Sequence, residues 1–447
     1  MAITNITANL AANTTYTAGT YYMNNSYSMN GKTITFDCSG GSIYFKRADN
    51  AAWTSRTRFI TTNSSATNKV YITSKNDDTI GETVPGSTGS PSATTGEWSS
   101  TVETYSYKYW EVRYCNCGSA PLIGGWETYS STATNIVEYI VFKNCGTGTN
   151  VGYPTIWMTG GASSKFDNII MDKTNTCTMQ RGIVIYYNVN NGTISNIYWN
   201  PAGNTASQAF FWYQHTVNVT MNDCYFTCND RSVWWQFLVE VSPSSGKTTT
   251  LNRCYIGGDF GDIDGSNTTT ITANDCIFER YIVSDQTTPP NITVNNCIFI
   301  YSAFQTKTGK TVTATNCIFA GGCKIINGGA GYVPTVVSSY NGFYNCDETN
   351  WTRGTGDFTA DPAFRTVTGG TIATYASATP FMLPDGYMPS SSAYVKTGSN
   401  TYDNLSIDET IYSPNGYKHL GTENIWPGIY YRMDVWGAQH RLFMQGH

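Results

Sequence analysis

Short runs of alternating apolar and polar residues recur along the middle of the chain. Residues 292–300 read ITVNNCIFI, and residues 312–320 read VTATNCIFA. In both runs an Asn-Cys step separates two segments in which apolar residues fall at alternate positions. Such period-2 alternation on both sides of a bend predicts two short strands, each sending alternate side chains inward.

The Asn-Cys step, or a variant of it, returns every 20 to 30 residues. The aligned positions are Cys117, Cys145, Ile169, Ile197, Cys224, Cys254, Cys276, Cys297, Cys317 and Gly342. Leucine-rich repeats share this period but need regular Leu spacing, and helical repeats need apolar residues about 3.6 positions apart. Neither spacing occurs here, so the pattern predicts a parallel β-helix in which each repeat forms one rung.

Rungs stacked about 4.8 Å apart place equivalent side chains in columns. The cysteines are therefore expected to form a buried column of reduced thiols, because parallel Cβ vectors suit disulfides poorly and apolar neighbours leave no room for metal ligation. The residue before this column is Asn in seven rungs: Asn116, Asn144, Asn168, Asn196, Asn296, Asn316 and Asn341. Asn tolerates the left-handed conformation that a tight bend requires. Three middle rungs have Asp223, Arg253 or Asp275 there and an Asn one place earlier, which predicts a differently built bend.

The Asn-Cys rungs resemble those of the right-handed parallel β-helices of the pectate-lyase-like superfamily, firmly over residues 105–344. Residues 17–45 are similar to N-terminal capping rungs, and residues 71–91 resemble a segment of bacterial surface β-helix proteins. Residues 359–365 and 434–439 resemble closing segments. The resemblance implies an all-β, right-handed parallel β-helix with an N-terminal cap and an irregular C-terminal segment. It does not specify a function, because this fold carries lyases, hydrolases, adhesins and viral tailspikes.

One continuous domain is expected, since no low-complexity linker interrupts the chain. Residues 1–110 form the cap and first rungs, with a Ser/Gly/Thr-rich loop at 83–102. Residues 111–345 form the regular β-helix, and residues 346–447 form the C-terminal rungs and closing segment.

Composition excludes several classes of protein. The chain has 447 residues, a formal charge of −5 and 13% charged residues, whereas an ordinary domain carries about 25% charged residues. Lys and Arg do not cluster, so nucleic acid is not an expected partner. The first twenty residues lack the basic and apolar regions of a secretory signal, and no segment has the roughly 20 apolar residues that span a bilayer. Neither a signal peptide nor membrane insertion is therefore expected.

Three aromatic segments fall in the longest rungs, between Cys145 and Cys254. Alternation predicts that one set of their side chains faces inward: Val184, Phe210 and Trp234. The outward-facing set is Tyr187, Trp212 and Trp235. His215, the one histidine of the repeat region, lies close to Trp212 in the sequence and is included in the candidate site. Exposed rings among Asn and Thr suit the faces of sugars, so this stripe is a candidate glycan site. A subunit interface is the equally weighted alternative, because interfaces are also rich in aromatic residues.

Acidic residues gather just after this stripe. Asp259, Asp262 and Asp264, with Glu240, are the weak candidates for the paired carboxylates of a glycoside hydrolase. The paired-Asp and Gly-His-Gly elements of polygalacturonases are missing from the sequence, as is the Arg pattern of pectate lyases. The spacing of the aspartates does not match a calcium loop at its first step, so ordinary turn chemistry is favoured. A bound Ca²⁺ is the remaining alternative, and no metal or other cofactor is expected.

Three classes of function fit these observations. The favoured one is a non-catalytic virion or surface protein, such as a phage spike, fibre or head decoration, that binds a host-surface glycan. The alternatives are a polysaccharide depolymerase, either lyase or glycoside hydrolase, and a bacterial surface adhesin. The expected partners are host-surface polysaccharide, further copies in a homotrimer and other virion proteins. The expected location is a virion or an extracellular surface.

Overall fold

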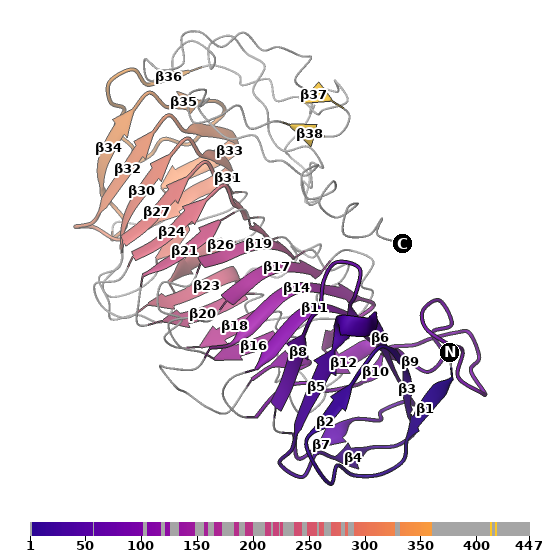
Figure 1. Ribbon diagram of the computed structural model, residues 1–447. Helices are drawn as coiled ribbons and strands as arrows, with labels where there is room; N and C mark the ends of the chain where they lie inside the picture. Colours follow the sequence, from indigo (N-terminus) through magenta and orange to yellow (C-terminus); the bar gives the residue numbers. More distant parts are fainter. Residues whose placement is uncertain are drawn as a thin grey trace. The chain divides into compact units, whose positions relative to one another are not determined.

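The structure is a computed structural model, and the regular secondary structure of the residues that it describes is almost entirely β-strand (Figure 1). They are residues 2–56, 58–101, 105–117, 121–125, 134–147, 156–159, 165–171, 183–186, 193–199, 211–215, 218–222, 224–226, 237–243, 248–256, 259–262, 270–278, 282–284, 290–326, 331–359, 412–413 and 416–417. Within these ranges the only helical segment is the 3-10 turn η1 (Cys38–Gly40). In the same part of the chain, no helix is long and apolar enough to cross a membrane.

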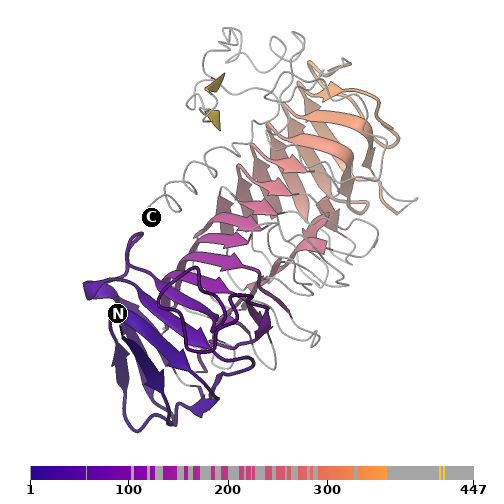
Figure 2. The same cartoon turned by 90° about the vertical axis from the view of Figure 1, so that its right-hand side faces the viewer.

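The chain divides into two compact units. The N-terminal unit is built mainly from Met1–His215, and the C-terminal unit from Thr216–Thr227 and Phe237–Gln445. In each unit, strands lie side by side in layers, and a strand pairs in parallel with the strand one rung later (Figures 1 and 2).

Two series of strands begin the N-terminal unit. One is β1 (Ile3–Ile6), β3 (Gly19–Met23), β6 (Ile43–Arg47) and β9 (Val70–Ser74), and the other is β2 (Thr14–Tyr16), β5 (Thr33–Asp37) and β8 (Arg58–Thr62). Both series continue into the longer strands β11 (Ser106–Arg113), β14 (Ile136–Lys143), β17 (Lys165–Met171) and β19 (Thr193–Trp199).

A third series in this unit is β13 (Ile123–Gly124), β16 (Ile156–Thr159), β18 (Ile183–Tyr186) and β20 (Phe211–His215). Two small sheets add β4 (Tyr27–Ser28) with β7 (Trp53–Thr54), and β10 (Thr94–Thr95) with β12 (Cys115–Cys117) and β15 (Gly146–Thr147). The interior near the N-terminus is aromatic. Phe36, Phe45, Trp98 and Trp110 are fully buried, with Phe45 and Trp98 packed edge to face at 4.8 Å.

The C-terminal unit repeats one pattern with few changes. Its first series is β21 (Val219–Asn222), β24 (Thr248–Asn252), β27 (Thr270–Asn274), β30 (Asn291–Asn295), β32 (Thr311–Thr315) and β34 (Thr335–Ser339). The second is β22 (Tyr225–Phe226), β25 (Tyr255–Ile256), β28 (Ile277–Phe278), β31 (Ile298–Gln305), β33 (Ile318–Ile326), β35 (Gly342–Phe343) and β36 (Phe358–Thr359).

The third series of the C-terminal unit is β23 (Phe237–Pro243), β26 (Asp259–Asp262) and β29 (Ile282–Ser284), which pairs with the end of β31. Apart from these, β37 (Tyr412–Ser413) and β38 (Gly416–Tyr417) form an antiparallel pair. The stacked parallel series confirm the predicted all-β parallel β-helix.

The cysteine column is confirmed in the C-terminal unit. Its members are free thiols with no exposed surface: Cys224, Cys254, Cys276, Cys297 and Cys317. A column of stacked phenylalanines runs beside it, with ring centroids 5.1 Å apart for Phe278 and Phe299 and again for Phe299 and Phe319. Burial raises the pKa of the Cys276 and Cys297 thiols well above its ordinary value. These cysteines therefore act as small apolar side chains.

The bends at Arg253 and Asp275 are not built differently, so the prediction was wrong for these two rungs, whereas Asp223 lies outside the described residues. Arg253 and Asp275 have φ of 54°, and Asn296 and Asn316 have φ of 53°, so all four take the same left-handed conformation. The asparagines one place earlier belong to a second column of amide hydrogen bonds. Asn252 Nδ2 donates to Asn222 Oδ1 at 2.8 Å, Asn274 to Asn252 at 2.9 Å and Asn295 to Asn274 at 3.0 Å.

The sequence alignment of the first and last rungs was also wrong. Arg113 pairs with Lys143 and Asn116 with Gly146, so Cys115, not Cys117, stands opposite Cys145. At the other end Gly342 pairs with Ile318, which puts Asn341 opposite Cys317. In these two rungs the left-handed residue is a tyrosine, Tyr114 with φ 51° or Tyr340 with φ 55°, so the Asn that guided the alignment lies outside the bend.

A second misalignment lies between Cys145 and Ile169. Ile169 pairs with Ile140 and with Ile197, five positions before the cysteine column. The rung that contains β14 has two left-handed bends, one at Tyr139 (φ 57°) and one at Asn144 (φ 53°). Asn168 stacks on the first bend, at Tyr139, whereas Asn144 forms the second bend. The two asparagines therefore do not occupy equivalent positions in their rungs.

The column of thiols predicts selective resistance to alkylation. Thiolate is the reactive form, and burial both raises the pKa of Cys276 and Cys297 and blocks access. Iodoacetamide at pH 8 should leave these two unmodified in the folded protein, and Cys346, which is half-buried, should react before them. Peptide mass spectrometry after a timed pulse measures this order. Equal labelling of all three would contradict the buried column.

The amide column predicts a local stability cost. Asn274 shares hydrogen bonds with both Asn252 and Asn295, so Asn274→Ala should lower the free energy of unfolding by roughly 1–3 kcal/mol. Thr272→Ala, two positions earlier on the same face of β27, is the matched control and should cost less. Denaturant unfolding of both variants decides between them, and equal losses would show that the column contributes nothing specific.

Candidate functional site

The roles predicted from the sequence for the candidate site residues stay predictions, because the structure does not describe their side chains. Tyr187, Trp235 and Asp264 lie outside the described residues. The structure gives the backbone of five others: Trp212 and His215 in β20, Glu240 in β23, and Asp259 and Asp262 in β26. β23 and β26 are neighbours, with Glu240 paired to Gly261. Among the described residues, no three His, Cys, Asp or Glu side chains are grouped to hold a metal ion.

The register of β18 and β20 is known for two of these positions. Val184 pairs with Trp212 in the neighbouring parallel strands. The predicted inward and outward sets of aromatic side chains stay predictions.

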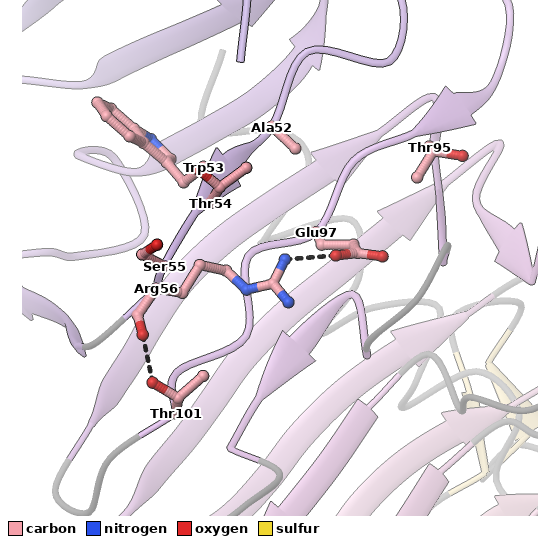
Figure 3. Close-up of a pocket in the computed structure, with 8 residues that line it drawn as sticks. All are labelled: Ala52, Trp53, Thr54, Ser55, Arg56, Thr95, Glu97 and Thr101. Carbon is pink, nitrogen blue, oxygen red and sulfur yellow. Dashed lines mark hydrogen bonds and ion pairs between the residues drawn. The ribbon is translucent and has the colours of Figure 1, made fainter. Parts of the chain in front are cut away.

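The structure reveals a pocket that the sequence did not predict (Figure 3). It has a volume of about 600 Å³ and lies in the N-terminal unit between β7 with the residues after it and the segment that follows β10. Its lining residues are Ala52, Trp53, Thr54, Ser55, Arg56, Thr95, Glu97 and Thr101. Six of these eight residues are polar or charged, and the two apolar ones are Ala52 and Trp53.

An ion pair between Arg56 and Glu97 crosses this pocket (Figure 3). Arg56 Nη1 donates to Glu97 Oε2, and the side chains are only 14% and 7% exposed. Thr101 Oγ1 donates to the Arg56 carbonyl, which fixes the backbone beneath the guanidinium. An arginine carries N–H donors and a carboxylate carries acceptor oxygens, so the pair brings both kinds of group to the pocket.

The Trp53 wall of the pocket is part of the aromatic core. The indole is fully buried and packs near Phe45 at 6.3 Å and Tyr27 at 6.5 Å between ring centroids. Its Nε1 has no hydrogen-bond partner among the described residues. Large packed rings leave few alternative rotamers, so this wall is rigid.

The opposite wall is held from inside by Arg47. This residue is 1% exposed and donates from Nη1 to the Thr95 carbonyl and from Nη2 to the Thr94 carbonyl, both at 2.7 Å. Nη2 also donates to the Tyr114 carbonyl at 3.0 Å. The guanidinium fills the space beside Gly96, where a Cβ would lie 2.5 Å from Arg47 Cζ. Glycine is thus required between the pocket residues Thr95 and Glu97.

A second buried cation holds the start of the same segment. Lys46 Nζ donates to the Asp77 carbonyl at 2.7 Å, and the Asp77 carboxylate accepts from Thr73 at 2.7 Å and pairs with Arg113 at 3.0 Å. Burial lowers the pKa of Lys46, and the nearby carboxylates of Asp77 and its neighbours oppose that shift. Residues 77–97 are therefore attached to the core at both ends.

A charged surface on β11, β14 and β17 is the other polar feature of this unit. Glu138 lies 3.5 Å from both Lys108 and Lys165, and the Tyr109 and Tyr139 rings stack in parallel at 4.3 Å. The stacked rings cover each other's faces, and each charge there has an opposite neighbour. This surface therefore offers less to a ligand than the pocket does.

Sequence reasoning missed Arg56 and Glu97 because 41 residues separate them and neither belongs to a motif. The available signal was the Ser/Gly/Thr-rich loop at 83–102, since polar loops on a rigid scaffold often carry binding residues. Only the fold shows that this loop lies against β7.

The Arg47 attachment predicts that Gly96→Ala disturbs the pocket wall. The new methyl group would displace a guanidinium that is fixed by three carbonyls, which should cost about 1–3 kcal/mol in the free energy of unfolding. Hydrogen exchange at residues 94–98 should also rise. Gly331→Ala, where the added Cβ meets no atom within 4 Å, is the control and should change neither quantity. Unchanged exchange in Gly96→Ala would exclude this role for Arg47.

Comparisons of the chain with protein-family models, with curated proteins and with solved structures found no match. The fold assignment therefore rests on the strand register, and the proposals for function rest on the geometry of the described residues.

Proposed function

We propose that this protein is a non-catalytic β-helical virion or surface protein that binds a host-surface glycan in the Arg56–Glu97 pocket. The observation that carries the proposal is the largely buried ion pair in a pocket that is also lined by hydroxyl groups. Ligand sites combine a preformed cavity with a few placed polar groups, and this pocket has both.

The hydroxyl groups around the pair suit a sugar. Thr54 and Ser55 are exposed at one wall and Thr95 is half-exposed at the other. A hydroxyl can donate and accept hydrogen bonds, so these side chains can adapt to the hydroxyls of a pyranose. A ligand rich in hydroxyl groups is thus complementary to the lining as a whole.

The pocket favours binding over hydrolysis. Glycoside hydrolases use two carboxyl groups, one on each side of the scissile bond. Glu97 is the one carboxylate among the described residues that line the pocket, and Arg56 already pairs with it. The depolymerase alternative would use other residues, for which the neighbouring strands β23 and β26 with Glu240, Asp259 and Asp262 are the candidates.

The wider assignment rests on sequence features. The Asn-Cys rungs support membership of the pectate-lyase-like superfamily and a right-handed coil. The low charge content of 13% and the free cysteines support a phage spike, fibre or head decoration, with an adhesin as the alternative. A homotrimer that contacts other virion proteins completes this proposal.

A glycan array with bacterial capsule and lipopolysaccharide fractions tests the proposal. The full chain should bind at least one glycan, and Arg56→Met should weaken binding about tenfold or more, because a charged hydrogen-bonding group is lost. Arg353→Met is the matched control, since it removes an arginine from the exposed Glu348 pair elsewhere. Thermal unfolding must show both variants folded.

The same fractions, assayed for new reducing ends and unsaturated sugars, separate a binder from a depolymerase. Release of oligosaccharides that disappears in an Asp259→Asn or Asp262→Asn variant would replace the proposed function by the enzymatic one. Absence of binding by the folded protein to every fraction would reject glycan recognition.

A further inference from the structure

We propose that Cys323 and Cys346 form a disulfide on contact with an oxidising small-molecule disulfide, and that this bond fastens the segment after β35 to β33. The modification site lies in the C-terminal unit, apart from the pocket residues, so it is tested independently of glycan binding. Three observations carry the proposal: how the backbone places the two cysteines, how unequally they are exposed, and what the segment after Cys346 covers.

Backbone hydrogen bonds set the two cysteines side by side. Lys324 and Asp347 form a parallel bridge. The Asp347 amide donates to the Cys323 carbonyl at 2.8 Å, and the Ile325 amide donates to the Asp347 carbonyl at 3.1 Å. Side chains alternate along extended chain, so Cys323 and Cys346, each one place before the bridge, turn to the same side of it. Adjacent strands lie about 4.8 Å apart, which is within the roughly 4.4–6.8 Å between the Cα atoms of a disulfide.

This pair differs from the buried cysteine column in two respects. Cys323 has no exposed surface but Cys346 is half-buried, so a dissolved reagent can reach one of the two sulfurs. Asp347 belongs to an isolated bridge and not to a strand, so the chain at Cys346 can adjust to the geometry that a disulfide needs. In contrast, Cys297 and Cys317 are both fully buried and lie between regular strands.

The two thiols have different roles in the reaction. Burial, and after it the neighbouring Cys346 thiol, raises the pKa of Cys323 well above its ordinary value. Little Cys323 thiolate therefore exists at neutral pH, and the accessible Cys346 reacts first. Cys346 Sγ lies 2.9 Å from the Phe319 carbonyl oxygen of β33 and 3.2 Å from the Tyr344 carbonyl oxygen. These contacts hold the Cys346 thiol against the strand that contains Cys323.

The oxidant is a small disulfide, for which glutathione disulfide is the probe. The Cys346 thiolate attacks one of its sulfurs, and one glutathione leaves as a thiolate that takes up a proton. Cys323 then loses its proton and attacks the Cys346 sulfur of the mixed disulfide, which releases the second glutathione. In total, two protein thiols become one disulfide and one glutathione disulfide becomes two glutathione thiols, so electrons and protons balance.

The bond acts on the segment that covers the end of the phenylalanine column. Trp351 lies shortly after Cys346 and is 8% exposed. Its ring centroid is 5.4 Å from that of Phe319 and 6.2 Å from that of Phe343. Fastening Cys346 to β33 therefore restrains the segment that places Trp351 over these rings. The virion or extracellular surface of the proposed function is an oxidising environment, in which disulfides persist.

Oxidation of the reduced full chain with glutathione disulfide at pH 8 tests the proposal. The remaining thiols are alkylated at timed intervals, and non-reducing peptide mass spectrometry identifies the linked peptides. Linkage of Cys323 to Cys346 should be about tenfold or more faster than linkage of Cys297 to Cys317, because one sulfur of the first pair is accessible. Hydrogen exchange at residues 347–351 should slow about threefold or more in the oxidised protein, since the bond restrains this segment.

Cys323→Ser separates the two steps of the reaction. Without the second sulfur, Cys346 should stop at the mixed disulfide and keep one bound glutathione, which the unmodified protein releases. Cys38→Ser is the matched control, because it removes a buried thiol from the N-terminal unit and should leave the linkage of Cys323 to Cys346 unchanged. Thermal unfolding shows whether both variants are folded, and the peptide map of the unmodified protein decides the question if Cys323→Ser is not.

Several results would overturn the proposal. A lasting mixed disulfide at Cys346 of the unmodified protein would show that Cys323 does not reach it. Linkage of Cys346 to another cysteine, equal rates for the two pairs, or no oxidation under conditions that oxidise the urea-unfolded chain would also reject the site. Unchanged hydrogen exchange in the linked protein would reject the restraint on the segment after β35. Each of these results leaves glycan binding to be decided by the array.

Discussion

The parallel hydrogen-bond register between successive rungs is the constraint on which the structure depends. In the C-terminal unit it sets Asn274 beside Asn295 and Phe299 beside Phe319. A slip of one residue would turn every side chain of a strand to the opposite face, exposing apolar residues and burying Thr and Asn. The columns of like residues also support the register in return, because amide hydrogen bonds and stacked rings form only when the pairing is kept.

The N-terminal unit adds buried positive charge to this layered core. Lys46 and Arg47 end β6, and both direct their donors to backbone carbonyls of the segment that carries Glu97. A buried charge is costly unless its hydrogen bonds are made, and the carbonyl groups provide them here. The position of Glu97 is therefore set by interactions from the core. A pocket built in this way keeps its shape before a ligand arrives, which lowers the entropic cost of binding.

The sequence was sufficient for the fold where the rungs are short and alike. Cys276, Cys297 and Cys317 stack as expected because few residues separate them and each follows one bend. It was insufficient where a tyrosine replaced the bend asparagine, as at Tyr114, or where a long rung contained two bends. Local pattern cannot distinguish two bends that need the same backbone conformation. The pocket could not be predicted from the sequence for another reason. Arg56 and Glu97 come together because of the course of the loop that carries Glu97, and that course depends on hydrogen bonds from the buried Arg47.

The short rungs around Cys297 have an evolutionary consequence. Each of them contacts chiefly the rung before and the rung after, so the array is close to one-dimensional. Duplication or loss of the segment from Cys297 to Cys317 would join equivalent columns and leave every neighbour relation intact. The protein can thus change its length by whole rungs under selection, while the N-terminal part of the sequence, which contains the pocket residues Arg56 and Glu97, evolves independently.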